Sequence, residues 1–129
     1  MGENPPVLLK LGADRVEIDQ RVAKLVATLN RIPGLSTFSS CGGHKNPTIS
    51  QTSSGRFEIN FEISRDRAGV EALELLTFAV EEMRGWRPRS LTLVAWFNGR
   101  ELNDGEISFA LGGRLSPDKL AAEIEKLLP

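Results

Sequence analysis

The sequence predicts an α+β fold in which a mixed or antiparallel sheet of four or more strands carries three helices. Three observations predict it: one segment alternates strictly between apolar and polar side chains, three segments repeat apolar residues at helical spacing, and strands follow one another in adjacent pairs. The expected order is helix, strand, a polar loop or edge strand, strand, helix, strand, strand, helix. A doubly wound parallel sheet fits less well because it needs strict alternation of strands and helices.

The first helix is expected after an extended lead-in over residues 1–13. Asp19 can cap it, because an aspartate carboxylate accepts hydrogen bonds from the free amides of a first turn. Apolar residues then recur at helical spacing: Val22, Leu25, Val26, Leu29 and Ile32. Pro33-Gly34 ends the helix. Its charged face is interpreted as a solvated surface with Arg21, Lys24 and Arg31.

Two strands are expected next. Residues 35–41 run as a short strand into Gly42-Gly43, and the polar segment 45–55 is interpreted as mainly loop or edge strand. Residues 56–63 alternate strictly between polar and apolar side chains, which predicts a strand with one buried face. Its apolar side, which faces the core, carries Phe57, Ile59, Phe61 and Ile63. Its polar side, which faces solvent, carries Arg56, Glu58, Asn60 and Glu62.

A second helix is expected from Asp66 to Gly85. Its apolar stripe consists of Val70, Leu73, Leu76, Val80 and Met83. Residues 91–97 then form a largely apolar strand, which we expect at the centre of the sheet with Trp96 in the core.

Turn signals at Asn98-Gly99 and at residues 103–105 precede a last strand over residues 106–111. Ser116-Pro117-Asp118 is a strong helix start, because serine caps, proline suits the first helical position, and aspartate suits the positive helix end. The inward-facing residues of this third helix are Leu120, Ile124, Leu127 and Leu128.

Composition indicates one ordinary globular domain over residues 1–129. The 16 basic and 17 acidic residues give a formal net charge of -1, which lowers the expectation of a dedicated nucleic-acid binder without excluding a local basic patch. The single cysteine excludes an internal disulfide and suits the reducing cytoplasm. The first residues lack a long apolar run, so neither a signal peptide nor a membrane span is expected.

The stretch S-S-C-G-G-H holds the only cysteine and the only histidine of the chain, Cys41 and His44. If Gly42-Gly43 were the centre of a β-turn, the flanking Cα atoms would lie within about 7 Å, and the imidazole would help form a reactive thiolate. A plain two-residue hairpin turn explains the glycines equally simply and is favoured on the residues alone. A structural zinc site uses four cysteine or histidine ligands, and the chain has one of each, so no metal is expected.

The same loop is also a candidate ligand site. Ser39 and Ser40, together with the amides of Gly42 and Gly43, form a donor-rich concavity that suits an anion, and Lys45 follows it. Ordinary turn chemistry remains the alternative, since serine is common in turns.

A second candidate is R-G-W-R-P-R, which contains Arg84, Arg87 and Arg89 around Trp86. Arginine contacts phosphates and tryptophan stacks on bases, so the segment is a possible RNA contact. The favoured alternative is a helix end with cations at its negative pole and the tryptophan packed on the core. Gly112-Gly113-Arg114 before the last helix is a weaker candidate for an anion site.

The S-S-C-G-G-H stretch stands in a longer pattern: Asp19, the helix to Leu29-Asn30, Pro33-Gly34 and then T-F-S-S-C-G-G-H, with A-L-E-L-L further on. In this pattern the chain resembles, loosely over residues 14–97, the third-step methyltransferase family of wybutosine-synthesising tRNA enzymes. It implies an α+β fold, S-adenosylmethionine as methyl donor and a tricyclic guanosine derivative in phenylalanine tRNA as substrate. It also implies that Ser39, Ser40, Cys41 and Gly43 form the site.

Two departures from that family stand inside the motif. Gly42 replaces a serine and His44 replaces an arginine, and the segment after the motif is short. We therefore expect a divergent relative of these S-adenosylmethionine-dependent enzymes, with Cys41 and His44 as the catalytic candidates. One alternative is a non-catalytic module of the same fold that binds a small anionic ligand or a protein. A second is a Cys-His thiol enzyme.

Overall fold

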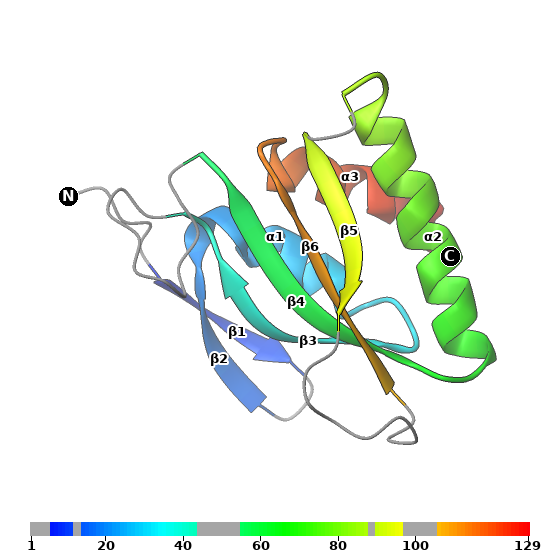
Figure 1. Ribbon diagram of the computed structural model, residues 1–129. Helices are drawn as coiled ribbons and strands as arrows, with labels where there is room; N and C mark the ends of the chain where they lie inside the picture. The colour runs from blue at the N-terminus through cyan, green and yellow to red at the C-terminus, as the bar shows by residue number, and fades with distance from the viewer. Residues whose placement is uncertain (1–5, 12–13, 44–54, 88–89, 97–105) are drawn as a thin grey trace.

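Six strands and three helices make up the part of the chain that the structure, a computed structural model, describes: residues 6–11, 14–43, 55–87, 90–96 and 106–129 (Figure 1). In chain order they are β1 (Pro6–Leu11), β2 (Asp14–Asp19), α1 (Gln20–Leu29), β3 (Leu35–Cys41), β4 (Phe57–Ser64), α2 (Arg67–Arg84), β5 (Leu91–Trp96), β6 (Glu106–Gly113) and α3 (Pro117–Leu127). The predicted segment 45–54 and the turns at 98–99 and 103–105 lie outside the described residues.

The strands form two antiparallel sheets. The larger sheet has the order β3-β4-β6-β5, and β1 pairs with β2 as a separate hairpin. Because β4 and β5 are both antiparallel to β6, they run parallel to each other, and α2 carries the chain across β6 between them. The predicted α+β class is confirmed. The β1–β2 hairpin was not predicted, since residues 1–13 were interpreted only as an extended lead-in.

The three helices pack on one face of the four-stranded sheet and leave the other face uncovered (Figure 1). The predicted alternation in β4 decides which face is which, because its four apolar side chains are all buried. The five apolar residues predicted for the first helix are buried, although α1 ends at Leu29 and Ile32 lies beyond it, before Pro33-Gly34. We call the opposite side the uncovered face. It carries Glu58, Asn60 and Glu62 from β4, Ser108, Ala110 and Gly112 from β6, and Thr92, Val94 and Trp96 from β5.

Helix α2 bears out most of the predicted stripe: Leu76 and Val80 are buried, and Leu73 and Met83 pack partly buried against the core. Val70 is 57% exposed, and the buried residues are Gly69, Ala72, Leu76, Ala79 and Val80. Small side chains dominate this stripe because the helix begins hard against β4: a Cβ added at Gly69 would overlap the carbonyl oxygen of Ser64. In α3, Leu120 and Ile124 are buried as predicted, whereas Leu127 is exposed.

Strand β5 is an edge strand, so its predicted central position is wrong. Among the described residues only β6 pairs with it, and β6 takes the place between β4 and β5. The apolar composition of β5 has a different cause. Val94 and Trp96 lie on the uncovered face, and Trp96 is 36% exposed rather than in the core.

The predicted cap of the third helix is confirmed, and the second helix, which begins after Asp66, has a side-chain cap as well. The Ser116 hydroxyl accepts from the Lys119 amide at 3.3 Å, with Pro117 at the first helical position. The Asp66 carboxylate accepts from the Gly69 amide at 3.0 Å and from the Ser64 hydroxyl at 2.6 Å. The Ser64 hydrogen bond, followed by that of the Gly69 amide, holds the pKa of Asp66 below its ordinary value of 3.8.

We predict that the contribution of Asp66 to stability is lost in acid. A lowered folded-state pKa means that this contribution is fully present above the unfolded value of 3.8 and disappears as pH falls through the folded value. Urea unfolding of the wild type and Asp66→Asn, from pH 7 to pH 2, measures the effect. The difference in unfolding free energy should stay constant above about pH 5 and shrink below it; a difference independent of pH contradicts the assignment.

Candidate functional site

The S-S-C-G-G stretch lies where β3 ends, and it is not a two-residue turn. Cys41 pairs with Glu58 of β4, so the chain between these two strands spans residues 42–56. Only Gly43 of the two glycines has a positive φ, at 102°. A tight hairpin needs both central residues of its turn next to the paired strand ends. The simple-turn interpretation of Gly42-Gly43 is therefore wrong.

A bulge in β3 sets which way the loop residues point. The register shifts between Thr37 and Ser39, so Phe38 is an extra residue on the bulged strand. Beyond it, Ser39 pairs with Asn60 and lies on the uncovered face. The same register puts Cys41 beside Glu58 on that face and Ser40, opposite Ile59, on the covered side. The side chains of Ser39 and Ser40 thus project from opposite faces of the sheet.

Two residues at the start of α1 hold the end of β3. The Gly42 amide donates to Asp19 Oδ2 at 2.8 Å, and Arg21 Nη1 donates to the Gly42 carbonyl at 2.8 Å and to the Arg56 carbonyl at 3.1 Å. Asp19 is the N-cap residue by position, but its side chain makes no cap hydrogen bond to the helix. The prediction of an ordinary cap is therefore wrong, and Arg21 does more than solvate a surface. We call this set of contacts the Gly42 clamp.

The clamp limits what the loop offers an anion. The Gly42 amide was expected to face a ligand, yet a carboxylate of the chain itself already occupies it, and both glycines are buried. Ser39 and Ser40 remain accessible at the surface. The donor-rich concavity predicted from sequence therefore loses one of its four donors.

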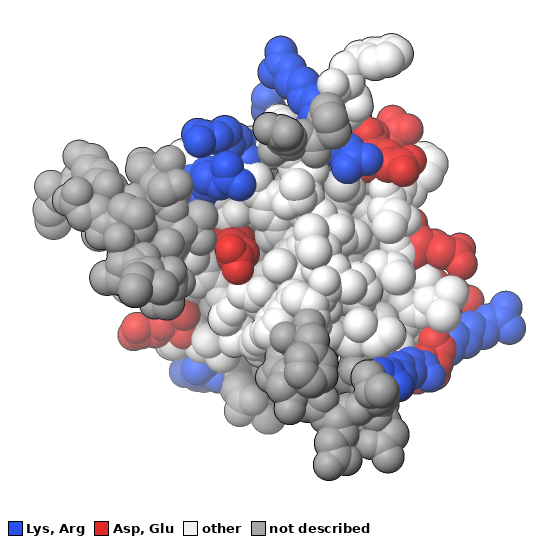
Figure 2. All heavy atoms as spheres, viewed as in Figure 1, with Lys and Arg blue, Asp and Glu red and all other residues white. Residues whose placement is uncertain are grey.

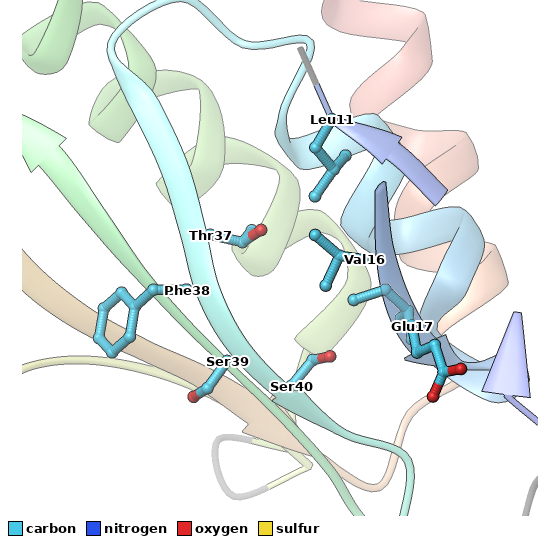
Figure 3. Close-up of a pocket in the computed structure, with 8 residues that line it drawn as sticks. Leu11, Val16, Glu17, Thr37, Phe38, Ser39 and Ser40 are labelled. Carbon is cyan, nitrogen blue, oxygen red and sulfur yellow. The ribbon is translucent and has the colours of Figure 1, made fainter. Parts of the chain in front are cut away.

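Two depressions meet at β3. One, of about 330 Å³, is a groove between β2 and β3, into which Leu11, Val16, Thr37 and Ser40 point (Figure 3). The other, of about 390 Å³, lies on the uncovered face and is lined by Phe38, Ser39, Glu58, Asn60, Val94, Trp96 and Ala110. In Figure 3 the side chains of Phe38 and Ser39 point away from the hairpin, and both also line the second depression. We call it the face depression.

Cys41 is half-buried, and no hydrogen bond among the described residues involves its thiol. His44 and Lys45 lie outside the described residues, so the expected thiol–imidazole pair stays a prediction. In the described part of the chain, no three His, Cys, Asp or Glu side chains gather closely enough to hold a metal ion.

Arginines gather at one end of the four-stranded sheet, where β3 and β6 end and β4 and β5 begin. A chain of backbone hydrogen bonds links three of the arginines that were predicted to contact phosphate: Arg87 N to Arg84 O at 3.0 Å, Ser90 N to Arg87 O at 3.0 Å, and Arg114 N to Ser90 O at 2.8 Å. Figure 2 shows basic side chains along this upper margin of the molecule and a largely uncharged centre of the uncovered face. We call Arg21, Arg56, Arg84, Arg87 and Arg114 the arginine end; Arg89 lies outside the described residues.

Trp86 projects fully into solvent at the arginine end, with a relative exposure of 100%. The interpretation of this tryptophan as packed on the core is therefore wrong. The glycines before Arg114 have a packing explanation instead, because a Cβ at Gly113 would overlap the Ser90 carbonyl and one at Gly112 would press on Phe57. Arg114 itself is exposed, and its Nη1 lies 3.8 Å from where a Cβ on Gly55 would stand.

Sequence reasoning missed the aromatic part of the site. Phe38 and Trp96 come from the two outer strands of the sheet, yet their ring centroids lie 6.0 Å apart with an interplanar angle of 51°. Phe38 was assigned no role, and Trp96 was assigned to the core. The polar alternation of β4 already pointed Glu58 and Asn60 to the outside, and this was the one signal available for the face depression.

No family model, curated protein or solved structure matches this chain. The resemblance to the wybutosine-synthesising methyltransferases therefore stays a prediction that rests on the motif and its helix–strand context. In the described residues, no helix is long and apolar enough to cross a membrane.

We predict that Asp19→Ala destabilises the protein by about 1–3 kcal/mol, because it leaves the buried Gly42 amide without an acceptor. Asp19→Asn, which keeps a side-chain oxygen in place, should recover part of the loss. Denaturant unfolding measures both. Glu17→Ala, an exposed change in the same strand, is the control and should shift stability by about 0.5 kcal/mol or less. Equal losses of stability in Asp19→Ala and Glu17→Ala would show that the Gly42 clamp does not stabilise the fold.

Proposed function

We propose that this chain binds single-stranded or looped RNA at the arginine end. The observation that carries the proposal is Trp86, which is fully exposed between Arg84 and Arg87. Leaving a whole indole in water forgoes roughly 1.5–3 kcal/mol of burial, and nothing among the described residues packs on it. An exposed aromatic ring next to guanidinium groups is the arrangement that stacks on a base while its neighbours contact phosphates.

The electrostatics of the arginine end support an anionic partner. Five arginines come together there from four separate parts of the chain, although the chain as a whole has a net charge of -1. A local cluster of cations of this kind attracts a phosphate backbone even where the total charge is near zero.

Single-stranded RNA suits the shape better than a duplex does. A duplex buries its base faces in the stack, whereas unpaired bases are free to stack on a protruding ring. The arginine end also adjoins the uncovered face, so a strand leaving Trp86 can continue over the sheet. This proposal keeps the RNA partner and the possible phosphate contacts that the sequence suggested, and it needs no catalytic step.

We predict that Trp86→Ala weakens binding of a labelled oligoribonucleotide of about ten nucleotides roughly tenfold, because stacking on an aromatic ring is worth about 1–3 kcal/mol per base. Fluorescence anisotropy measures the affinity. Phe78→Ala is the matched control, since Phe78 is also an exposed aromatic side chain on α2 but lies away from the arginine end. Equal affinities of the two variants would contradict the proposal.

We predict that Arg87→Gln lowers the salt dependence of RNA binding. Removing one phosphate contact should reduce the slope of log affinity against log salt by about 0.7. Arg67→Gln is the control, because Arg67 is also exposed but begins α2, about 26 Å along the helix from Arg84. An unchanged slope in Arg87→Gln, or the same decrease in both variants, would count against the arginine end.

Methyl transfer from S-adenosylmethionine remains a separate proposal that follows from the resemblance alone. Calorimetric titration with S-adenosylmethionine tests it independently of RNA. Binding that Cys41→Ala weakens would support it, and no heat at millimolar cofactor would contradict it.

A further inference from the structure

The face depression has a floor of small residues. Asn60, Ala110 and Val94 form one row across β4, β6 and β5, and the next row contains Glu58, Gly112 and Thr92. With alanine and glycine on the central strand, a flat molecule can lie close to the backbone of β6. The volume of about 390 Å³ is in the range of small-molecule sites.

One wall of the depression is aromatic. Phe38 enters at the bulge of β3 and Trp96 at the far end of β5, so the two rings reach toward each other over the two strands between them. They remain 49% and 36% exposed. Half-exposed aromatic rings on the open face of a four-stranded antiparallel sheet are a recurrent platform for stacking unpaired bases.

The polar groups of the depression are arranged to accept hydrogen bonds. Asn60 Nδ2 donates to Ser39 Oγ at 2.8 Å and to Glu58 Oε1 at 3.2 Å, which uses both of its hydrogens. The acceptors left for a ligand are the Asn60 amide oxygen and the second oxygen of Glu58. A ligand that fits has N–H donors on the edge of a flat ring.

Guanine is the base with that edge. Its N1–H and N2–H point the same way and suit a pair of oxygen acceptors such as the second Glu58 oxygen and the Asn60 amide oxygen, whereas adenine and cytosine place a ring acceptor beside their amino group and uracil has a single N–H. The negative charge of Glu58 also directs phosphate away from it. Along β6, the distance from Ala110 to Arg114 is about 13 Å, so a phosphate can reach the arginine end from a base in the depression.

We propose that the face depression binds a guanine base, stacked on Phe38 and Trp96 and held at its edge by Glu58. As the base-selecting part of the same RNA surface, the inference rests on the proposed function, but free nucleotides test it without RNA. Glu58, Asn60, Phe38 and Trp96 are then specificity residues that lie next to, and not within, the S-S-C-G-G motif.

The experiment uses the tryptophan that borders the depression. The chain has two tryptophans, so Trp86→Phe leaves Trp96 as the only indole. Titrating this variant with GMP, AMP, CMP and UMP and following fluorescence compares bases that carry the same phosphate. We expect GMP to quench Trp96 and to bind about tenfold more tightly than the other three.

Two further variants in the same background test the named contacts. Glu58→Gln should remove the preference for GMP, and Phe38→Ala should weaken all four nucleotides while Trp96 still reports. Glu74→Gln, which removes an exposed carboxylate on α2, is the control and should leave the preference unchanged. Circular dichroism and melting temperature establish that each variant folds; for a variant that unfolds, Phe38→Leu replaces Phe38→Ala.

The outcomes separate this inference from the proposed function. Equal binding of all four nucleotides, no quenching at all, or a GMP preference that survives Glu58→Gln overturns the guanine site. RNA binding that depends on Trp86 but shows no preference for guanine leaves the arginine end standing and overturns this inference alone. GMP binding without RNA binding leaves the guanine site standing and overturns the proposed RNA binding at the arginine end.

Discussion

The alternation along β4 is the constraint on which the rest of the structure depends. Burying its four apolar side chains contributes on the order of 10 kcal/mol, which is comparable with the whole net stability of a small domain. The helices must therefore lie on the side of Phe57, Ile59, Phe61 and Ile63. With all three helices committed to that side, the opposite face of the sheet stays open to solvent, and the polar residues of β4 become surface chemistry.

The Gly42 clamp and the arginine end follow from the same sheet. Because β3 ends where β4 begins, α1 can reach both with one arginine: Arg21 holds the carbonyls of Gly42 and Arg56. Across the sheet, the end of β6 is tied to the turn after α2 through Ser90. Cations from distant parts of the sequence thus converge at one end. The motif that looked most like a reaction centre is, in its glycine half, a structural junction.

Local patterns predicted the elements, and long-range contacts decided the site. The period of two in β4, the spacing in α1, the helix start at Asp66 and the cap at Ser116 are local, and all were predictable. The edge position of β5 was not predictable. A run of apolar residues has the same sequence pattern in a central strand covered by helices as in an edge strand whose aromatic and aliphatic side chains are exposed. Asp19 was misassigned for a similar reason: a cap and a contact to Gly42 need the same residue type. The Phe38–Trp96 pair joins strands 58 residues apart in sequence, and no spacing rule connects them.

The bulge at Phe38 has one more consequence, which concerns phase. Strand side chains alternate between faces, so a single additional residue reverses the assignment of everything that follows. If β3 instead paired regularly, with Phe38 opposite Asn60, Ser39 and Cys41 would turn toward the helices and Ser40 toward solvent. The open side of the sheet would then display a different set of functional groups with every other strand unchanged. In this protein, the pairing register of β3 therefore decides which chemical groups reach the surface, as much as the types of residue do.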